Sequence, residues 1–251
     1  MKNVDLNTSD RAALSEHAAK KILEQYGIPV VSEQVVDDAD SAVEAAEKFG
    51  FPVAIKGMGA SLMHKTEAGI VHLNLPDAVA VKNACQQISD AAGSALEGFL
   101  VQPHVQGRRE FVAGLFHDRV FGPVVMFGLG GIFTEALADV TFGVTPLTET
   151  DAEEMINEIK AARMLGAFRG EAEADKRQLI DTLVGLSQIG QNEPDISEVD
   201  INPLIVTFDG RICAVDALII KGGHSRPRPA TQPVDPRSLG KLFSQIGRAH
   251  V

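Results

Sequence analysis

The chain has 251 residues, of which 45% are hydrophobic and 23% are charged, a balance that is ordinary for a soluble globular enzyme. This length suits one domain or two closely associated lobes. The formal net charge of -11 disfavours nucleic-acid binding through a broad basic face, although a nucleotide needs only a few local cations and backbone N–H groups.

The same bulk features point to a cytoplasmic protein. The two cysteines, Cys85 and Cys213, form no CxxC pair, so neither a disulfide framework nor a zinc site is indicated. Residues 1–11 are polar and lack the apolar segment of a signal peptide. No apolar run approaches the roughly 20 residues that span a bilayer. We therefore expect contact with neither a membrane nor nucleic acid.

The first part of the chain predicts a compact α/β lobe. Apolar residues at helical spacing predict the helices, and Gly27 and Gly50 end the first two of them. Short apolar runs next to glycine or proline predict the strands. The expected helices are 15–26, 41–49 and 77–92, and the expected strands are 30–36, 51–56 and 70–75.

The second part predicts more strands and two further helices. The expected strands are 99–103, 110–115, 120–127, 199–207 and 211–219, and the expected helices are 151–165 and 174–190. A turn at Asp209-Gly210 joins the last two strands into a hairpin. After Lys221 the chain becomes proline-rich. The expected domains are therefore a first lobe at 12–98, a second lobe at 99–221 and a C-terminal arm at 222–251.

Lys56 is the first residue that could carry chemistry. A lysine at the end of a buried strand is costly unless its ammonium group meets an anion. The small residues that follow, Gly57 and Gly59 among them, would allow a ligand to approach the backbone. These features favour a phosphate contact, but on this pattern alone a strand-end lysine that reaches solvent is the simpler interpretation.

Two loops offer further candidates. His64 lies in a polar loop between two predicted strands and could accept a phosphoryl group or shuttle a proton, although composition alone favours a solvated polar turn. The run Gly-Leu-Gly-Gly at 128–131 matches neither GxGxxG nor a Walker loop. Close approach of the backbone to a phosphate and a simple tight turn both remain open for it.

The segment 198–204 is the richest in oxygen ligands. Glu198, Asp200 and Asn202 lie on one face of a strand, because side chains alternate at period two. The hairpin brings Asp216 back toward Asn202. Magnesium prefers oxygen ligands and is commonly held by one or two protein groups together with nucleotide phosphates. We therefore favour a metal site over the alternative, which is a polar solvent face on an edge hairpin.

Taken together, these motifs resemble one known family. Their order is the strand lysine, His-Lys-Thr-Glu (64–67), Val-Gln-Pro (101–103), Arg-Arg-Glu-Phe (108–111), Gly-Leu-Gly-Gly-Ile-Phe-Thr-Glu (128–135), Phe-Arg-Gly (168–170) and Glu-Val-Asp-Ile-Asn-Pro-Leu (198–204). This order resembles the ATP-grasp β subunit or domain of nucleoside-diphosphate-forming acyl-CoA synthetases, the ADP-forming acetate–CoA ligase group. It is similar, more distantly, to the β subunit of succinyl-CoA synthetase. The resemblance covers about residues 12–221.

The resemblance implies an ATP-grasp fold, with two lobes that clamp ATP or ADP, and it implies roles for single residues. Lys56 matches a lysine that contacts the nucleotide phosphates. The family segment that receives the adenine and ribose corresponds here to Val101, Gln102 and Pro103. Glu110 matches an acid in the same cleft of the family. Asn202 and Asp216 match the ligands of Mg2+. His64 matches a loop histidine that is a candidate phosphoryl carrier.

The resemblance also implies a partner, because the CoA-binding portion of the family is not in this chain. We expect a CoA-binding α-type subunit that carries its own phosphohistidine, in a hetero-oligomer. Two departures bear on function: Gly69 is followed by Ile70 where relatives often have a second glycine, and Gly143 stands where many relatives have arginine. A different ATP-grasp carboxylate ligase and a catalytically silent nucleotide-binding regulatory module are the alternatives.

Overall fold

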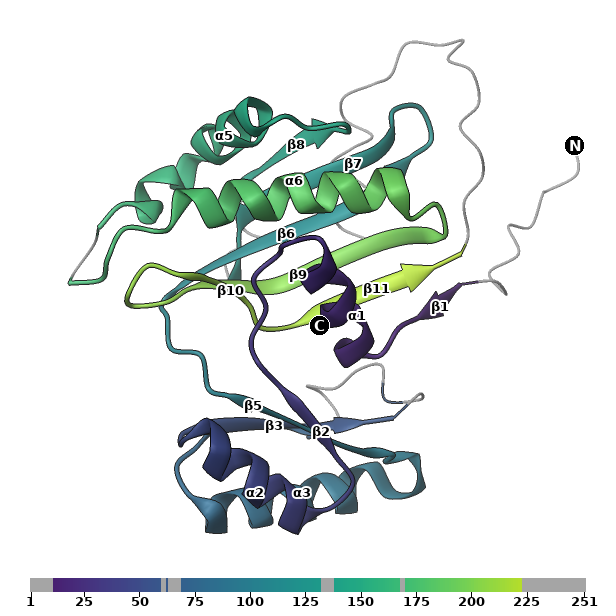
Figure 1. The fold of residues 1–251 in the computed structure, drawn as a ribbon, viewed down its shortest axis with the longest axis vertical. Helices are drawn as coiled ribbons and strands as arrows, with labels where there is room; N and C mark the ends of the chain where they lie inside the picture. Colours follow the sequence, from purple (N-terminus) through teal and green to yellow (C-terminus); the bar gives the residue numbers. More distant parts are fainter. Residues whose placement is uncertain (1–10, 60–61, 63–68, 132–137, 168–169, 223–251) are drawn as a thin grey trace, which may run out of the picture. The chain divides into compact units, whose positions relative to one another are not determined.

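The computed structural model describes residues 11–59, 62, 69–131, 138–167 and 170–222. This part of the chain forms two compact units (Figure 1). The smaller unit comprises residues 31–106, and the larger unit combines residues 11–30 with residues 107–222. Each unit is an antiparallel sheet with its helices on one face, so each has its own core.

The smaller unit contains a four-stranded sheet in the order β2-β5-β3-β4. Helices α2 and α3 begin at aspartate caps, Asp38 and Asp77, whose carboxylates accept hydrogen bonds from the first-turn N–H groups of Ser41 and Ala80. Their apolar faces pack on one face of the sheet (Figure 1). The elements are β2 (Gln34–Val36), α2 (Ala39–Phe49), β3 (Val53–Met58), β4 (Val71–Leu75), α3 (Ala78–Ala92), η2 (Gly93–Ala95) and β5 (Gly98–Pro103).

The larger unit contains a seven-stranded sheet with the path β1-β11-β9-β6-β7-β8, and β10 also pairs with β9. Helices α1, α5 and α6 supply the apolar side chains that cover one face of this sheet. The elements are β1 (Ala12–Ala13), α1 (Glu16–Gln25), β6 (Arg109–Asp118), β7 (Gly122–Leu129), β8 (Val140–Val144), α5 (Glu149–Glu158), η4 (Lys160–Leu165), α6 (Lys176–Asn192), β9 (Ile196–Val206), β10 (Ile212–Ala214) and β11 (Ala217–Lys221).

The core of the larger unit follows from strand alternation. Phe111 on β6 and Phe127 on β7 are diagonal neighbours, because Phe111 pairs with Leu129 and Phe127 with Ala113, and their rings stack with centroids 5.5 Å apart in the helix-side core. Val199 and Ile201 extend the same apolar face along β9. The residues between them in sequence therefore point away from the helices, and this opposite face is where the polar candidates lie.

The division of the chain differs from the lobe boundaries expected at 12–98 and 99–221. The strand β5 belongs wholly to the smaller unit, because it pairs with β3 over six residues, from Met58↔Gly98 to Val53↔Pro103. The N-terminal residues belong to the larger unit instead, because β1 pairs with β11 and α1 packs in that core. The expected arm at 222–251 lies outside the described residues, apart from Gly222.

Two expected elements are interrupted, and each interruption has a local cause. The helix expected at 151–165 stops at Glu158, and η4 follows because the carboxylate of Asp139 accepts hydrogen bonds from the N–H groups of Lys160 and Ala161, both at 2.7 Å. The strand expected at 211–219 splits into β10 and β11. The break lies opposite Asn202-Pro203, where proline has no N–H group to donate to the ladder.

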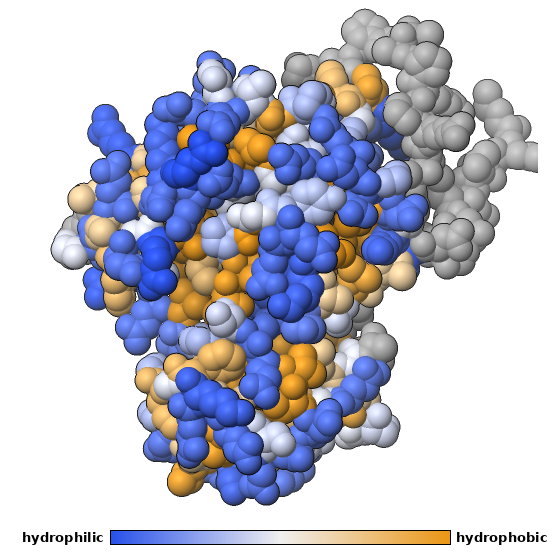
Figure 2. Space-filling view, in the orientation of Figure 1, coloured by the Kyte–Doolittle hydropathy of each residue, from blue (hydrophilic) through white to orange (hydrophobic). Residues whose placement is uncertain are grey.

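The visible surface is mostly hydrophilic, with apolar residues in smaller patches (Figure 2). Within the described ranges, no helix has both the length and the apolar character that crossing a bilayer requires.

Candidate functional site

Lys56 lies inside β3 rather than at its end, because the strand runs on to Met58. Its neighbours Val53 and Ile55 pack against α2 and α3, so alternation directs Lys56 to the opposite face of the sheet. The residue is nevertheless only 3% exposed. An ammonium group held in such a place is a strong local source of positive charge for an anion that reaches that face.

The segment 101–103 lies beside Lys56 on β5. Ala54 pairs with Gln102 and Lys56 pairs with Leu100, so Gln102 and Lys56 share the sheet face that is free of helices. Gln102 is buried, whereas Val101 points into the helix-side cluster. Val101 can therefore offer a ligand only its backbone. Pro103 ends the strand and has no N–H group, so its backbone can only accept a hydrogen bond.

The glycines after Lys56 have packing reasons of their own. A Cβ atom on Gly59 would lie 2.0 Å from the carbonyl oxygen of Ala95, and one on Gly57 would lie 2.8 Å from Ile88. Both positions therefore need glycine for close approach within the smaller unit. The expected approach of a ligand to this backbone stays a prediction.

Glu110 and the glycine run 128–131 meet in the larger unit. The N–H group of Gly130 donates to the carbonyl oxygen of Glu110 at 2.9 Å. A Cβ atom on Gly131, which has a φ of 72°, would lie 3.2 Å from the Glu110 carboxylate. Gly128 and Gly130 are instead pressed against neighbouring strands. The run thus brings loop backbone next to a half-buried carboxylate.

Glu198 and Asp200 lie on the helix-free face of the larger sheet, as their spacing predicted. Their neighbours Val199 and Ile201 point into the helix-side core. Asp200 is only 7% exposed and pairs across the sheet with Gly114 and Leu218. Gly114 is needed for close packing there, because a Cβ atom on it would lie 2.8 Å from the carbonyl oxygen of Val199.

Asn202 and Asp216 lie opposite each other at a paired irregularity. Ala214 pairs with Leu204 and Ala217 pairs with Ile201. The two residues between Ile201 and Leu204 on β9 therefore face the two residues between Ala214 and Ala217, which places Asn202 opposite Asp216. These four flanking residues all belong to the helix-side core. Strict alternation would allow only one of the two on each strand to do so, because they lie three residues apart. Both strands therefore depart from alternation over two residues at the same level, although β9 keeps one register with β10 and β11. The register shift lies on the other side of β9, where Asn202 and Pro203 together face Val112 of β6, as in a β-bulge.

The donor set at this irregularity suits magnesium. Asn202 is exposed, Asp216 is half-buried, and one carboxylate oxygen of Asp216 accepts a hydrogen bond from the N–H group of Ala217 at 2.8 Å. That bond orients the carboxylate. Among the residues that the structure describes, no cluster of three or more His, Cys, Asp or Glu side chains could hold a metal by itself. Two oxygen donors fit an ion whose other ligands are water and phosphate.

His64 and its neighbours 63–68 lie outside the described residues, so its expected role stays a prediction. The same is true of Phe168 and Arg169 in the Phe-Arg-Gly motif.

Arg109 belongs to the Arg-Arg-Glu-Phe motif, and the sequence patterns gave it no role of its own. Its guanidinium group is 2% exposed, bonds Glu171 at 3.1 Å, and donates to the carbonyl oxygens of Met164, Gly166 and Ala172. One side chain therefore ties both ends of the segment 166–172 to the start of β6. The motif by itself could not predict this role, because an arginine beside an acid is common on any surface.

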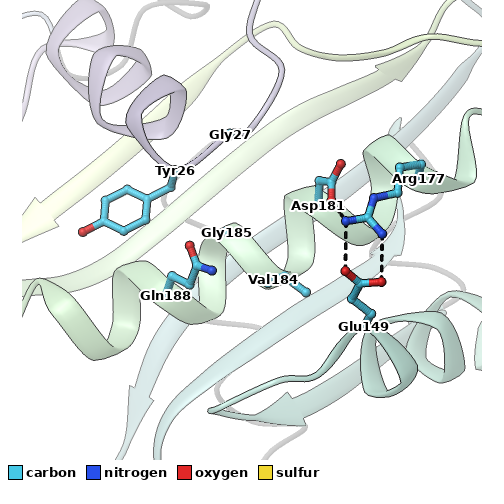
Figure 3. A pocket seen from close by; sticks show the side chains of 8 residues that line it. All are labelled: Tyr26, Gly27, Glu149, Arg177, Asp181, Val184, Gly185 and Gln188. Carbon is cyan, nitrogen blue, oxygen red and sulfur yellow. Dashed lines mark hydrogen bonds and ion pairs between the residues drawn. The ribbon is translucent and has the colours of Figure 1, made fainter.

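A pocket of about 290 Å³ opens elsewhere on the larger unit, between the end of α1, the start of α5 and α6 (Figure 3). None of the candidate residues lines it. Its charges satisfy one another, because Arg177 bonds both oxygens of Glu149, at 2.8 and 2.9 Å, and also Asp181. This pairing lowers the pKa of Glu149 and raises that of Arg177. The pocket therefore gives no sign of being the nucleotide site.

Comparison with known proteins decides the family. The family model described as "ATP-grasp domain" matches residues 5–220. The chain belongs to the ATP-grasp family. It is 40% identical over 220 residues to the β subunit of ADP-forming acetate–CoA ligase II of Pyrococcus furiosus, a match that covers 85% of this chain and 93% of the relative. The resemblance and the α/β fold class inferred from the motifs are therefore confirmed.

Two further relatives also match most of this ATP-grasp chain. Acetate–CoA ligase [ADP-forming] I of Archaeoglobus fulgidus is 36% identical, with 80% of this chain matching only 30% of that longer protein. The acetyl-coenzyme A synthetase 1 of Ca. Korarchaeum cryptofilum superposes with a TM-score of 0.79 at 39% identity, covering 84% of this chain and 94% of the relative's chain. Another structure of the Korarchaeum protein contains coenzyme A and Mg-AMPPCP, with its phosphohistidine segment pointing towards the nucleotide binding site.

Proposed function

We propose that this chain is the nucleotide-binding subunit of an ADP-forming acyl-CoA synthetase, an acid–thiol ligase that links an acyl-CoA to its free acid. Its part is phosphoryl transfer between the nucleotide and a phosphohistidine. The observation that carries the proposal is the placement of Lys56 and of the pair Asn202–Asp216 on helix-free sheet faces of the two units, within the family of acetate–CoA ligase β subunits.

Each residue has a separate task in the proposed transfer. Lys56 neutralises charge on the nucleotide phosphates, and Gln102 with the backbone of Val101 and Pro103 receives the adenine and ribose. Glu110 orients the ligand. Asn202 and Asp216 hold Mg2+, which, when bound, would neutralise charge on the phosphate oxygens. Such a transfer depends mainly on positioning and charge neutralisation, and these residues supply both.

His64 is the proposed carrier. A ring nitrogen of neutral imidazole attacks the phosphorus of a partner's phosphohistidine, the partner's P–N bond breaks, and a new P–N bond forms on His64. A terminal β-phosphate oxygen of ADP then attacks that phosphorus, and the P–N bond to His64 breaks. ATP forms, and the electron pair of the broken bond returns to the ring nitrogen, which leaves His64 as neutral imidazole. In the reverse direction ATP supplies the phosphoryl group for acyl-CoA synthesis.

The partner is proposed to be a CoA-binding α-type subunit with its own phosphohistidine, in a hetero-oligomer. The proposal is supported by the extent of the match, which is nearly a whole β subunit in Pyrococcus but 30% of the longer Archaeoglobus ligase. The Korarchaeum structure with a phosphohistidine segment near its nucleotide site supports the same division of labour.

The lone chain provides the test. Calorimetry with ATP and magnesium should show binding, while an assay of CoA consumption with ATP and an acid should show no turnover until the copurified native partner is added. Turnover by the chain alone would contradict the proposal, and so would a chain that binds no nucleotide.

A silent regulatory module is the one competing function that a feature of this chain favours. Gly143 replaces the arginine of many relatives, and a Cβ atom there would lie 2.6 Å from both Leu147 and Met155. This chain therefore has no room for a larger side chain at that position without repacking. Magnesium-dependent phosphoryl transfer in the reconstituted pair would exclude the silent module.

A further inference from the structure

Glu110 and the glycine run lie at one end of the larger sheet, where the regular pairing of β6 stops. The last pair between β6 and β7 is Phe111↔Leu129, and beyond it the N–H group of Gly130 donates to the carbonyl oxygen of Glu110. On its other side, β6 shifts register with β9 between Phe111 and Ala113. Glu110 therefore belongs to a short end piece of β6 that a bulge separates from the rest of the strand.

This end piece is attached through the side chain of Arg109. The guanidinium group, which is buried, reaches a segment more than fifty residues later in the sequence. It donates to the carbonyl oxygens of Met164 and Gly166, both at 3.1 Å, and of Ala172, at 2.6 Å, and it bonds the buried carboxylate of Glu171 at 3.1 Å. The planar group thus has an acceptor in each of several directions, which fixes its orientation.

The acceptors of this arginine are themselves held by other contacts. The N–H group of Ala172 donates to the carbonyl oxygen of Phe208 at 3.0 Å, and that of Asp175 donates to the carbonyl oxygen of Gly210 at 2.7 Å. A Cβ atom on Gly210 would lie 2.1 Å from the carbonyl oxygen of Glu173, so glycine is needed for this close approach. The acceptors therefore belong to a segment that is attached to the turn before β10 independently of the arginine.

A second buried charge, Asp139, holds the other end of the short helix η4. Its carboxylate accepts from the N–H groups of Lys160 and Ala161, both at 2.7 Å, and its carbonyl oxygen accepts from the N–H group of Leu129 in the glycine run, at 3.0 Å. A helix leaves N–H groups free in its first turn and carbonyl groups free in its last. Asp139 binds the first set and Arg109 binds carbonyl groups of the last, so η4 connects β8 with the start of β6.

We propose that Arg109 and Asp139 are positioning residues for Glu110. By binding the two ends of η4, they keep the start of β6 against the glycine run, so that the Glu110 carboxylate stays beside the backbone of Gly131. Hydrogen bonds have a narrow range of favourable distance and angle, so these contacts restrict the backbone more than apolar packing does. The inference rests on the proposed function in giving Glu110 a ligand to orient.

The test uses two variants of the full chain and two measurements. Arg109→Lys keeps the charge and loses the planar group that reaches its separate acceptors, whereas Asp139→Asn keeps the shape and loses one of two acceptor oxygens. The first measurement is amide hydrogen exchange at Gly130 without ligand, which reports the bond between Gly130 and Glu110. The second is the dissociation constant of ATP at saturating magnesium, by calorimetry.

Two controls separate positioning from general stability. Arg108→Lys is the same substitution on the neighbouring residue, whose side chain is 72% exposed. Leu183→Ala opens a cavity where α6 packs in the helix-side core and should lower the melting temperature. Both controls should leave the exchange at Gly130 and the affinity for ATP unchanged, measured well below the melting temperature.

Arg109→Lys is expected to speed exchange at Gly130 by about tenfold or more and to weaken ATP binding by about tenfold, the scale of losing a hydrogen bond to a charged group. Asp139→Asn should change both quantities in the same direction and by less. The double variant Glu110→Gln/Arg109→Lys should bind ATP no more weakly than Glu110→Gln alone, because Arg109 acts through Glu110.

Parental exchange at Gly130 in both single variants would overturn the inference, and so would a double variant in which the two losses of affinity add. If Arg109→Lys does not fold, Asp139→Asn decides alone, combined with Glu110→Gln in the same way. Glu110→Gln by itself separates this failure from that of the proposed function. If it leaves the affinity for ATP unchanged, the proposed role of Glu110 is wrong, whereas exchange at Gly130 still tests the connection through η4.

Discussion

The two units place their candidate residues by different means. In the smaller unit, Lys56 and Gln102 lie where β3 and β5 pair without a register shift, and simple alternation sets their direction. The register shift of β3, between Val53 and Ile55, concerns its pairing with β4. In the larger unit, Asn202 and Asp216 lie where two neighbouring strands depart from alternation together. A regular strand can position a long cationic side chain, because the side chain itself supplies the reach. Short oxygen ligands need the backbone to bring them together.

This difference has a consequence for robustness. The position of Lys56 depends on backbone pairing that many residues share. Substituting the Lys56 side chain should therefore change ligand binding and leave the path of the strand unchanged. Asp216 depends on a paired irregularity whose flanking strands are hydrogen-bonded to residues of the N-terminal part of the chain, Leu14 and Pro29. Changes far from Asp216 should therefore disturb its position. The experiments below break or sharpen this contrast, beginning with the largest expected effect.

His64→Ala should have the largest effect, and it tests whether the smaller unit supplies more than charge. Partner-coupled phosphoryl transfer should fall by about a hundredfold or more, the scale for losing one positioned catalytic group, while nucleotide affinity changes little. Rapid-quench measurement with the reconstituted pair gives the transfer rate, and calorimetry gives the affinity. Near-parental transfer would reject an essential role for His64.

Lys56→Met tests the cation on the regular strand. Losing a charge-assisted contact with phosphate should weaken ATP binding by about 10- to 100-fold, since such contacts contribute roughly 1.5–3 kcal/mol. Lys48→Met is the matched control, because it removes the same charge from the exposed face of α2. Equal losses in the two variants would show that net charge matters and the position of Lys56 does not.

Asp216→Asn tests the irregular pair. The variant keeps the shape of the side chain and one oxygen ligand, so we expect about a tenfold higher magnesium requirement for ATP binding with little change in melting temperature. Asp209→Asn in the exposed turn before β10 is the control. Chelation of magnesium with EDTA should abolish the difference between Asp216→Asn and the parent. A difference that persists without metal would contradict the assignment.

Glu149→Gln should have the smallest effect and concerns stability alone. Arg177 lowers the pKa of Glu149 below its ordinary value of 4.5, so the ion pair stabilises the fold above that pH and loses this contribution as pH falls through the lowered pKa. Both side chains are exposed, so the gain is small. Thermal melts should show the parent slightly more stable than the variant at pH 7, with the difference lost as the pH falls through the lowered pKa of Glu149.

The elements of both units were largely predictable from apolar spacing and glycine or proline boundaries. The helix-free direction of Asp200 followed from alternation alone. The split between β10 and β11 was not predictable in this way, because it depends on what lies opposite in the partner strand. Residues 12–30 could not be assigned to the larger unit either, since their partner β11 lies about two hundred residues later.

The candidate site shows the same limit. Asn202 and Asp216 were expected to approach each other across a hairpin, and the register does place them opposite each other. Their paired departure from alternation could not be derived, because it needs the core positions of Ala214 and Ala217 to be known. The burial of Arg109 could not be predicted from the sequence either, because three of its hydrogen-bond partners are backbone carbonyl oxygens more than fifty residues away.

The discontinuous larger unit has a consequence for biosynthesis. Residues 31–106 can fold as soon as they leave the ribosome, but the first strand, Ala12–Ala13, has no partner until Lys221 has been made. At roughly 5–20 residues per second, this delay lasts about 10–40 seconds. Throughout that time the strands that later cover α1 are missing. Glu16 and Lys20 of α1, which form a buried ion pair in the finished fold, therefore remain exposed to solvent until then. The nascent chain therefore completes its proposed lysine-bearing half first and its proposed metal-bearing half last.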